Sequence, residues 1–182
     1  FCGNYDGSES ENAFDQIRLH LDEVYTDTAK KQSETKDLVV NYALYITGKK
    51  LGRDLAAQRN FLRTSYDTAA DRGYEVATRF VTSLSDITVF RYYYWTKQGI
   101  EELGRFHGIE SVDQIQLLSS VIKDMKTSLA LPILARYWHP DLKTMGDQEF
   151  CEVLRAVAAF LVLRRAATGG TAGIDGDFRA IM

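Results

Sequence analysis

The sequence predicts an all-α protein, a multi-helix bundle of about seven to nine helices. Three observations support this prediction. The chain has only 2 prolines and 13 glycines in 182 residues, too few for the many turns of a β fold. Its apolar residues recur at spacings of three and four rather than in alternation. Its content of 45% hydrophobic and 26% charged residues is that of a soluble domain long enough to bury a core.

Residues 1–35 are expected to form an acidic N-terminal helix region, because they carry eight acidic residues against three basic ones. Ser10 or Asn12 is a suitable N-cap for the helix. Gln32-Ser33-Glu34 interrupts the apolar pattern, so we expect the helix to end before this segment. The apolar stripe that predicts the helix consists of Ala13, Phe14, Ile17, Leu21, Val24, Tyr25 and Thr28.

Residues 36–182 are assigned to a single helical bundle domain. Thr35 precedes its first helix, which is expected to stop at Gly48, a residue type that commonly ends helices. This helix is apolar on more than one side, which favours a central position. The next helix is expected over residues 51–71, ending before Gly73, with inward positions at Leu55, Phe61, Leu62, Tyr66 and Ala69.

A long helix is predicted to start at Tyr74 and to continue to about Trp95. Arg91 occupies a position in its apolar stripe, so we expect the aliphatic stem to pack while the guanidinium reaches a partner or water. The stripe consists of Val76, Ala77, Phe80, Val81, Leu84, Ile87, Tyr94 and Trp95.

Shorter helices follow. One is expected over 99–108, one over 111–125 and one over 127–138, in which Pro132 fits best within the first turn. The last long helix is predicted for residues 148–167, with Gly169-Gly170 as its stop, and a short amphipathic piece follows at 174–181.

The sequence lacks the common catalytic motifs, including phosphate-binding loops, the nucleophile elbow and the helical zinc motif. His20, His107 and His139 lie in separate segments without ligand spacing, so we expect no metal site, no cofactor and no catalytic residue. Cys2 and Cys151 are far apart, and Cys151 is expected to pack as a small core residue.

Two groups of residues are candidates for contacts. The run from Arg91 to Trp95 has the composition of a base-stacking surface, but on a helix most of these side chains must pack, which leaves Tyr92 and Tyr93 as partner-facing candidates. Arg164 and Arg165 follow an apolar run near a helix end. They either complement the helix dipole or contact another domain or a phosphate group, and Arg179 is grouped with them.

The C-terminal segment resembles a known family. Glu149-Phe150, the run from Leu154 to Arg165, Thr168-Gly169 and the run from Thr171 to Ile174 are similar to the helical region of GmrSD-type restriction endonucleases, where a Phe-Leu-x-x-Arg-Arg helix precedes a glycine. Upstream, residues 38–62 and 80–94 resemble the helices around the central bundle of that family, so the resemblance spans most of residues 36–182.

The resemblance implies a role in bacterial defence against phage, by cutting foreign or modified DNA. Family members join a ParB-like nucleotide-hydrolysing domain with an Asp-Gly-Gln-Gln-Arg motif to an HNH-type nuclease. This chain has neither motif. We therefore expect residues 1–182 to be a fragment of a longer protein, the helical connector of such an enzyme. The expected partners of this connector are the adjacent domains and DNA.

The alternative expectation is a stand-alone helical interaction module that dimerises or binds a partner. An independent enzyme is the least favoured class, because no set of acid, base or metal-ligand residues is apparent. No apolar run approaches the roughly 20 residues that cross a bilayer, so we expect no membrane segment and, by default, a cytoplasmic location.

Overall fold

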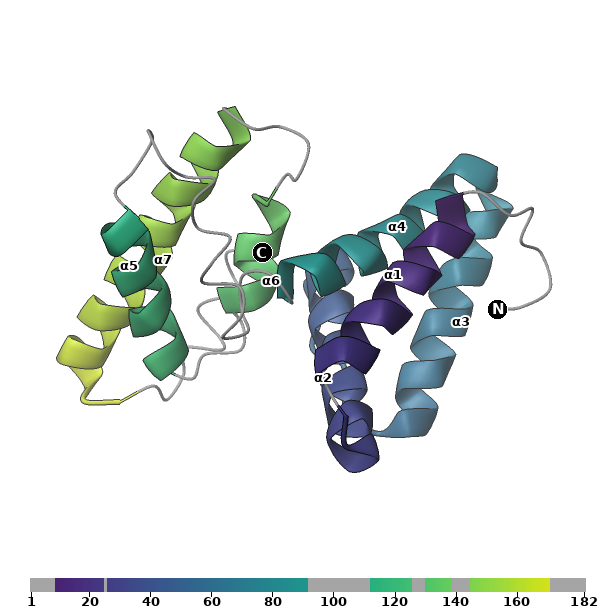
Figure 1. Ribbon diagram of the computed structural model, residues 1–182, viewed down its shortest axis with the longest axis horizontal. Helices are drawn as coiled ribbons and strands as arrows, with labels where there is room; N and C mark the ends of the chain where they lie inside the picture. Colours follow the sequence, from purple (N-terminus) through teal and green to yellow (C-terminus); the bar gives the residue numbers. More distant parts are fainter. Residues whose placement is uncertain (1–8, 25, 92–111, 126–129, 139–144, 171–182) are drawn as a thin grey trace. The chain divides into compact units, whose positions relative to one another are not determined.

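The computed structural model describes residues 9–24, 26–91, 112–125, 130–138 and 145–170 (Figure 1). These residues contain seven α-helices and no strand, which confirms the all-α class. The chain divides into two compact units, unit 1 over Phe1–Tyr92 and unit 2 over Tyr93–Met182. None of the helices in the described ranges combines the length and the apolar content that crossing a membrane requires.

Unit 1 contains α1 (Glu9–Val24), α2 (Thr28–Thr47), α3 (Leu55–Asp71) and α4 (Tyr74–Phe90). The predicted interruption at Gln32–Glu34 is wrong, because α2 already begins at Thr28. The Asp27 side chain caps α2 by accepting a hydrogen bond from the Lys30 backbone N–H at 2.7 Å. The polar residues at 32–34 continue the helix on its largely solvent-facing first turns, where apolar side chains are not needed.

The ends of α2 and α3 follow cap chemistry. Gly48 adopts a left-handed φ of 67° and donates to the Leu44 carbonyl at 2.9 Å, which confirms the predicted stop. Asp54 caps α3 by accepting from the Ala57 N–H at 2.8 Å, so the helix starts later than expected. Leu55 therefore stands at the first helical position and is 45% exposed, which makes its predicted inward position wrong.

The core of unit 1 lies mainly where α1 and α3 pack against α4, with α2 completing it. The stripe of α4 is confirmed over Ala77, Val81, Leu84 and Ile87, whereas Val76 in the first turn is exposed. Gly73, at a φ of 124°, separates α3 from α4 as predicted. The buried apolar residues of α1 and α2 are Ala13, Ile17, Leu38, Val39, Tyr42, Ala43 and Leu44.

Unit 2 contains α5 (Val112–Asp124), α6 (Ala130–Arg136) and α7 (Met145–Thr168). α5 and α7 lie side by side, and α6 contacts α7 (Figure 1). Pro132 stands in the first turn of α6, as predicted, where its missing N–H breaks no helical hydrogen bond. Trp138 and Phe150 meet edge to face with ring centres 5.4 Å apart, and Cys151 is a buried free thiol as expected.

Candidate functional site

The predicted contact residues Arg164 and Arg165 lie in the last turns of α7. The helix ends where Gly169 adopts a φ of 68° and donates to the Arg165 carbonyl at 2.8 Å. The Thr168 hydroxyl donates to the Arg164 carbonyl at 2.8 Å. Both arginines therefore stand beside the negative end of the helix dipole, and the glycine stop predicted from the sequence is confirmed.

The two arginines differ in their surroundings. Arg164 is half-buried, whereas Arg165 is exposed and donates from Nη1 to the sulfur of Met125, the residue after α5, at 3.2 Å. Within the described part of the chain, no carboxylate forms an ion pair with Arg165. Leu163, the residue before the pair, is 69% exposed. This end of α7 thus presents basic and apolar groups together.

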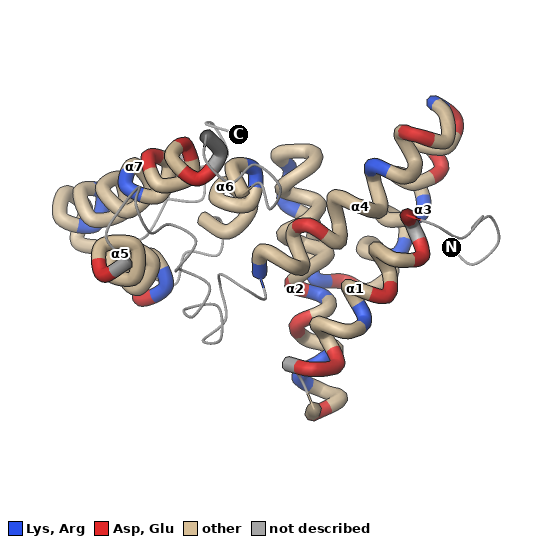
Figure 2. Tube along the Cα trace, turned by 45° about the horizontal axis from the view of Figure 1, so that its top comes forward, with Lys and Arg blue, Asp and Glu red and all other residues tan. Residues whose placement is uncertain are grey.

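Charge is segregated along α7 (Figure 2). Its acidic residues, Asp147, Glu149 and Glu152, all lie in the first half, whereas Arg155 lies near the middle and Arg164 and Arg165 lie in the last turns. This order complements the helix dipole at both ends. It also leaves the last turns of α7 with two arginines and no acidic residue.

The remaining predicted contact residues, Tyr92, Tyr93 and Arg179, lie outside the described residues. So do His107 and His139. His20 is buried on α1, and its burial lowers the pKa of the imidazole, a shift that the nearby Glu23 carboxylate partly offsets. Across the described ranges, no three or more histidine, cysteine, aspartate or glutamate residues gather as a metal-binding group.

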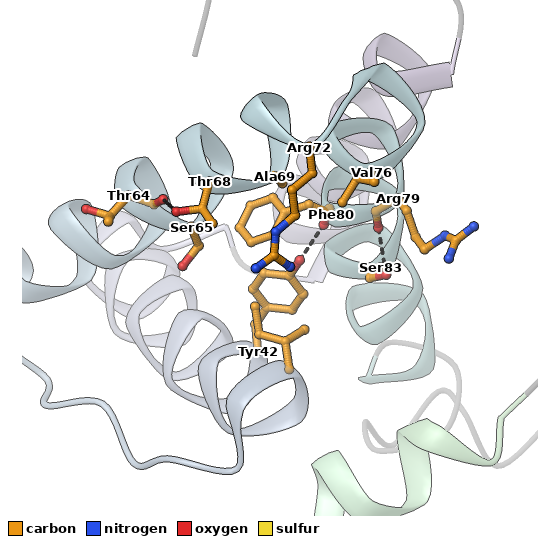
Figure 3. A pocket seen from close by; sticks show the side chains of 11 residues that line it. Tyr42, Thr64, Ser65, Thr68, Ala69, Arg72, Val76, Arg79, Phe80 and Ser83 are labelled. Atoms are coloured by element: carbon orange, nitrogen blue, oxygen red, sulfur yellow. Dashed lines mark hydrogen bonds between the residues drawn. The ribbon is translucent and has the colours of Figure 1, made fainter.

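A pocket in unit 1 was not anticipated from the sequence. It lies between α2, α3 and α4 and has a cavity volume of about 380 Å³ (Figure 3). Its signal in the sequence is weak, because it depends on small residues of α3 facing large residues of two other helices. The lining consists of Tyr42, Ile46, Thr64, Ser65, Thr68, Ala69, Arg72, Val76, Arg79, Phe80 and Ser83.

Tyr42 and Phe80 give the pocket a rigid aromatic side. The rings meet edge to face with centres 5.2 Å apart, and the Tyr42 hydroxyl donates to the Phe80 carbonyl. Burial raises the pKa of the Tyr42 phenol, and the nearby Tyr45 and Asp86 raise it further. The phenol is therefore a neutral hydrogen-bond donor at physiological pH, which suits a binding surface better than proton transfer.

Comparison with known proteins assigns no family to the chain. No protein-family model matches it, and no curated protein matches it significantly. The similarity to GmrSD-type endonucleases therefore stays a prediction that depends on the residues of the C-terminal segment.

Proposed function

We propose that this chain is the helical connector of a GmrSD-like, modification-dependent restriction endonuclease that acts in phage defence. In this role it couples a nucleotide-hydrolysing domain to a nuclease domain and contacts DNA through Arg164 and Arg165. The observation that carries the proposal is the segment from Arg164 to Gly169 at the end of α7, where two consecutive arginines, one of them exposed, precede a left-handed glycine stop.

The physical features of α7 support a contact role over a purely structural one. A capping arginine needs only its charge near the helix end, and either arginine alone would provide that. Two consecutive arginines next to an exposed leucine supply more charge than one helix dipole requires. Guanidinium groups also match the geometry of phosphate oxygens, and they pair with the carboxylates of a neighbouring domain equally well.

The gene itself provides the first experiment. If the proposal is correct, the reading frame extends upstream into a nucleotide-hydrolysing domain with an Asp-Gly-Gln-Gln-Arg motif and downstream into an HNH box. A frame that encodes neither domain contradicts the proposal.

The second experiment separates coupling from catalysis in the full-length protein. Arg164→Gln with Arg165→Gln is expected to reduce nucleotide-dependent cleavage of modified DNA while nucleotide hydrolysis persists, because neither arginine takes part in hydrolysis. Arg59→Gln with Arg63→Gln, at exposed positions of α3, removes the same charge and serves as the control. Equal cleavage by both double variants would show that the α7 arginines have no coupling role.

Exposed leucines in unit 2 favour the alternative, a stand-alone dimerisation module. Leu117 on α5 is 64% exposed and Leu163 on α7 is 69% exposed, and such side chains are typical of a surface that a partner covers. Sedimentation analysis of the chain distinguishes the two proposals. A connector should sediment as a monomer, whereas a stable dimer that Leu163→Glu dissociates would favour the alternative.

A further inference from the structure

The pocket of unit 1 exists because α3 presents small side chains to two aromatic residues. Ser65, Thr68 and Ala69 follow one another along the face of α3 that lines the pocket, and they are too short to fill the space beside Tyr42 and Phe80. The resulting volume of about 380 Å³ lies at the lower end of the range for small-molecule sites. It can hold a single ring with one substituent, but not a large cofactor.

The aromatic side of the pocket is held in place before any ligand arrives. Tyr42 is fully buried, and its hydroxyl is hydrogen-bonded to the backbone of α4. Phe80 is packed between Tyr42 and Tyr66, whose ring centre lies 6.3 Å away. Phe80 is only half-buried, so a flat apolar group placed against its ring would bury apolar surface while Tyr42 stays in place, which favours binding.

The polar side of the pocket is positively charged. The lining contains two arginines and no aspartate or glutamate. In Figure 3 the Arg72 side chain extends toward the side of the pocket where Tyr42 lies, whereas Arg79 points away from the pocket. Among the residues that the structure describes, none pairs with the Arg72 guanidinium or with the half-buried Ser65 hydroxyl. Arg72 thus holds a permanent charge and several hydrogen-bond donors at the rim of an apolar hollow.

We propose that this pocket binds a small aromatic anion, an aryl carboxylate or an aryl phosphate. The ring lies against the half-buried Phe80, and the anionic group accepts charge-assisted hydrogen bonds from Arg72 and a hydrogen bond from Ser65. This inference is independent of the connector proposal, because the pocket uses none of the α7 residues. Either one can fail without the other.

The test is a titration of the ¹⁵N-labelled chain followed by NMR, with phenyl phosphate and benzoate as the probes. We expect saturable shifts at the amides of Ser65, Thr68 and Ala69. Inorganic phosphate lacks the ring and benzyl alcohol lacks the charge, so each should bind at least about tenfold more weakly than phenyl phosphate. A preference for phenyl phosphate over benzoate, or the reverse, identifies the anionic group that the pocket accepts.

Three variants make the result decisive. Arg72→Gln should weaken phenyl phosphate binding about tenfold or more, because charge-assisted hydrogen bonds are lost. Arg59→Gln also removes one positive charge, but from an exposed position of α3 outside the pocket. It should leave the affinity for phenyl phosphate within about twofold of the wild-type value. Ser65→Leu fills the hollow while keeping Arg72, and should abolish binding without lowering the melting temperature.

Three outcomes would overturn the inference. The first is the absence of shifts at the pocket amides with millimolar phenyl phosphate or benzoate. The second is equal weakening by Arg72→Gln and Arg59→Gln, which would mean diffuse charge attraction. The third is retention of binding in a folded Ser65→Leu variant.

Discussion

Arg91, predicted to lie in an apolar stripe, is the C-cap residue of α4, and the structure explains how its charge is tolerated there. Its guanidinium pairs with the Glu34 carboxylate and donates from Nη1 to the Glu34 carbonyl at 3.0 Å. The two side chains are only 16% and 23% exposed. The sequence predicted a packed stem with a partner or water for the charged head. It could not identify Glu34 as the partner, because that contact depends on how α2 approaches α4.

Arg91→Met is expected to destabilise unit 1 by about 1–3 kcal/mol, since it keeps an apolar stem but leaves a half-buried carboxylate without its partner. Arg53→Met is the matched control. Arg53 pairs with Asp37 at 2.9 Å, but its side chain is 78% exposed, so the loss should stay below about 1 kcal/mol. Urea unfolding followed by circular dichroism measures both values, and equal losses would contradict the expected role of Arg91.

Thr78 carries a buried hydroxyl for which the described residues supply no hydrogen-bond partner. Thr78→Val should therefore stabilise unit 1 by up to about 1 kcal/mol, because valine has the same shape without the desolvated polar atom. Thr88 is the comparison on the same helix, as its hydroxyl donates to the Leu84 carbonyl at 2.7 Å. Thr88→Val should be neutral or destabilising. If Thr78→Val is more destabilising than Thr88→Val, the Thr78 hydroxyl has a hydrogen-bond partner in solution, which would contradict the prediction.

At the scale of elements, α1 packs against α4 and buries His20. Burial lowers the pKa of His20 from its ordinary value of 6.5, so the unfolded chain takes up this proton before the folded chain does. The contribution of neutral His20 to stability is therefore complete above about pH 6.5 and is lost as the pH falls through the folded-state pKa.

His20→Leu should flatten this part of the pH dependence. We expect the wild-type free energy of unfolding to fall more steeply between pH 7 and 5 than that of the variant, and carboxylate titration common to both proteins cancels in the comparison. Chemical denaturation at a series of pH values measures the two profiles. Parallel profiles would mean that protonation of His20 does not destabilise the folded state.

The end of α7 allows a test of cap geometry with a neighbouring control. Gly169 has a φ of 68°, and a Cβ built there meets nothing within 4 Å, so Gly169→Ala introduces backbone strain alone. We expect a loss of about 1 kcal/mol in the stability of unit 2. Gly170 is equally open but lacks the positive φ, so Gly170→Ala should be neutral. Thermal unfolding distinguishes the two, and equal effects would argue against the left-handed cap.

Helix positions in this chain were predictable where local chemistry sets them. The periodicity of α4 and the glycines at 48, 73 and 169 gave correct positions, because stripes and left-handed caps depend on neighbouring residues. The error at Gln32–Glu34 arose from treating a polar segment as a break. Asp27 and Asp54 were available as N-caps, and they set the observed starts of α2 and α3.

At the scale of the whole molecule, the two candidate sites differ in how far the sequence could reveal them. Arg164 and Arg165 are adjacent in the chain, so the sequence alone identified them together with their glycine stop. The pocket unites Tyr42, Ser65 and Phe80 from three helices, and only the packing of α2, α3 and α4 brings them together. A site of this kind has no sequence spacing to recognise.

The contact of Arg164 and Arg165 with DNA has a quantitative signature, since the chain as a whole carries a net charge of −3 and any binding must come from local charge. Each phosphate neutralised contributes a slope of about −0.9 to the logarithm of the association constant against the logarithm of salt concentration. Arg164→Gln with Arg165→Gln should therefore make the slope less negative by about 1.8.

Fluorescence anisotropy with duplex DNA over a salt series measures these slopes, and Arg59→Gln with Arg63→Gln is the control of equal charge. That control should retain the wild-type slope, because exposed arginines on α3 of unit 1 have no part in the proposed contact. Equal changes in both double variants would indicate diffuse attraction. An unchanged slope in the Arg164/Arg165 variant would assign these arginines to a contact with protein, since a carboxylate partner releases no condensed counterions.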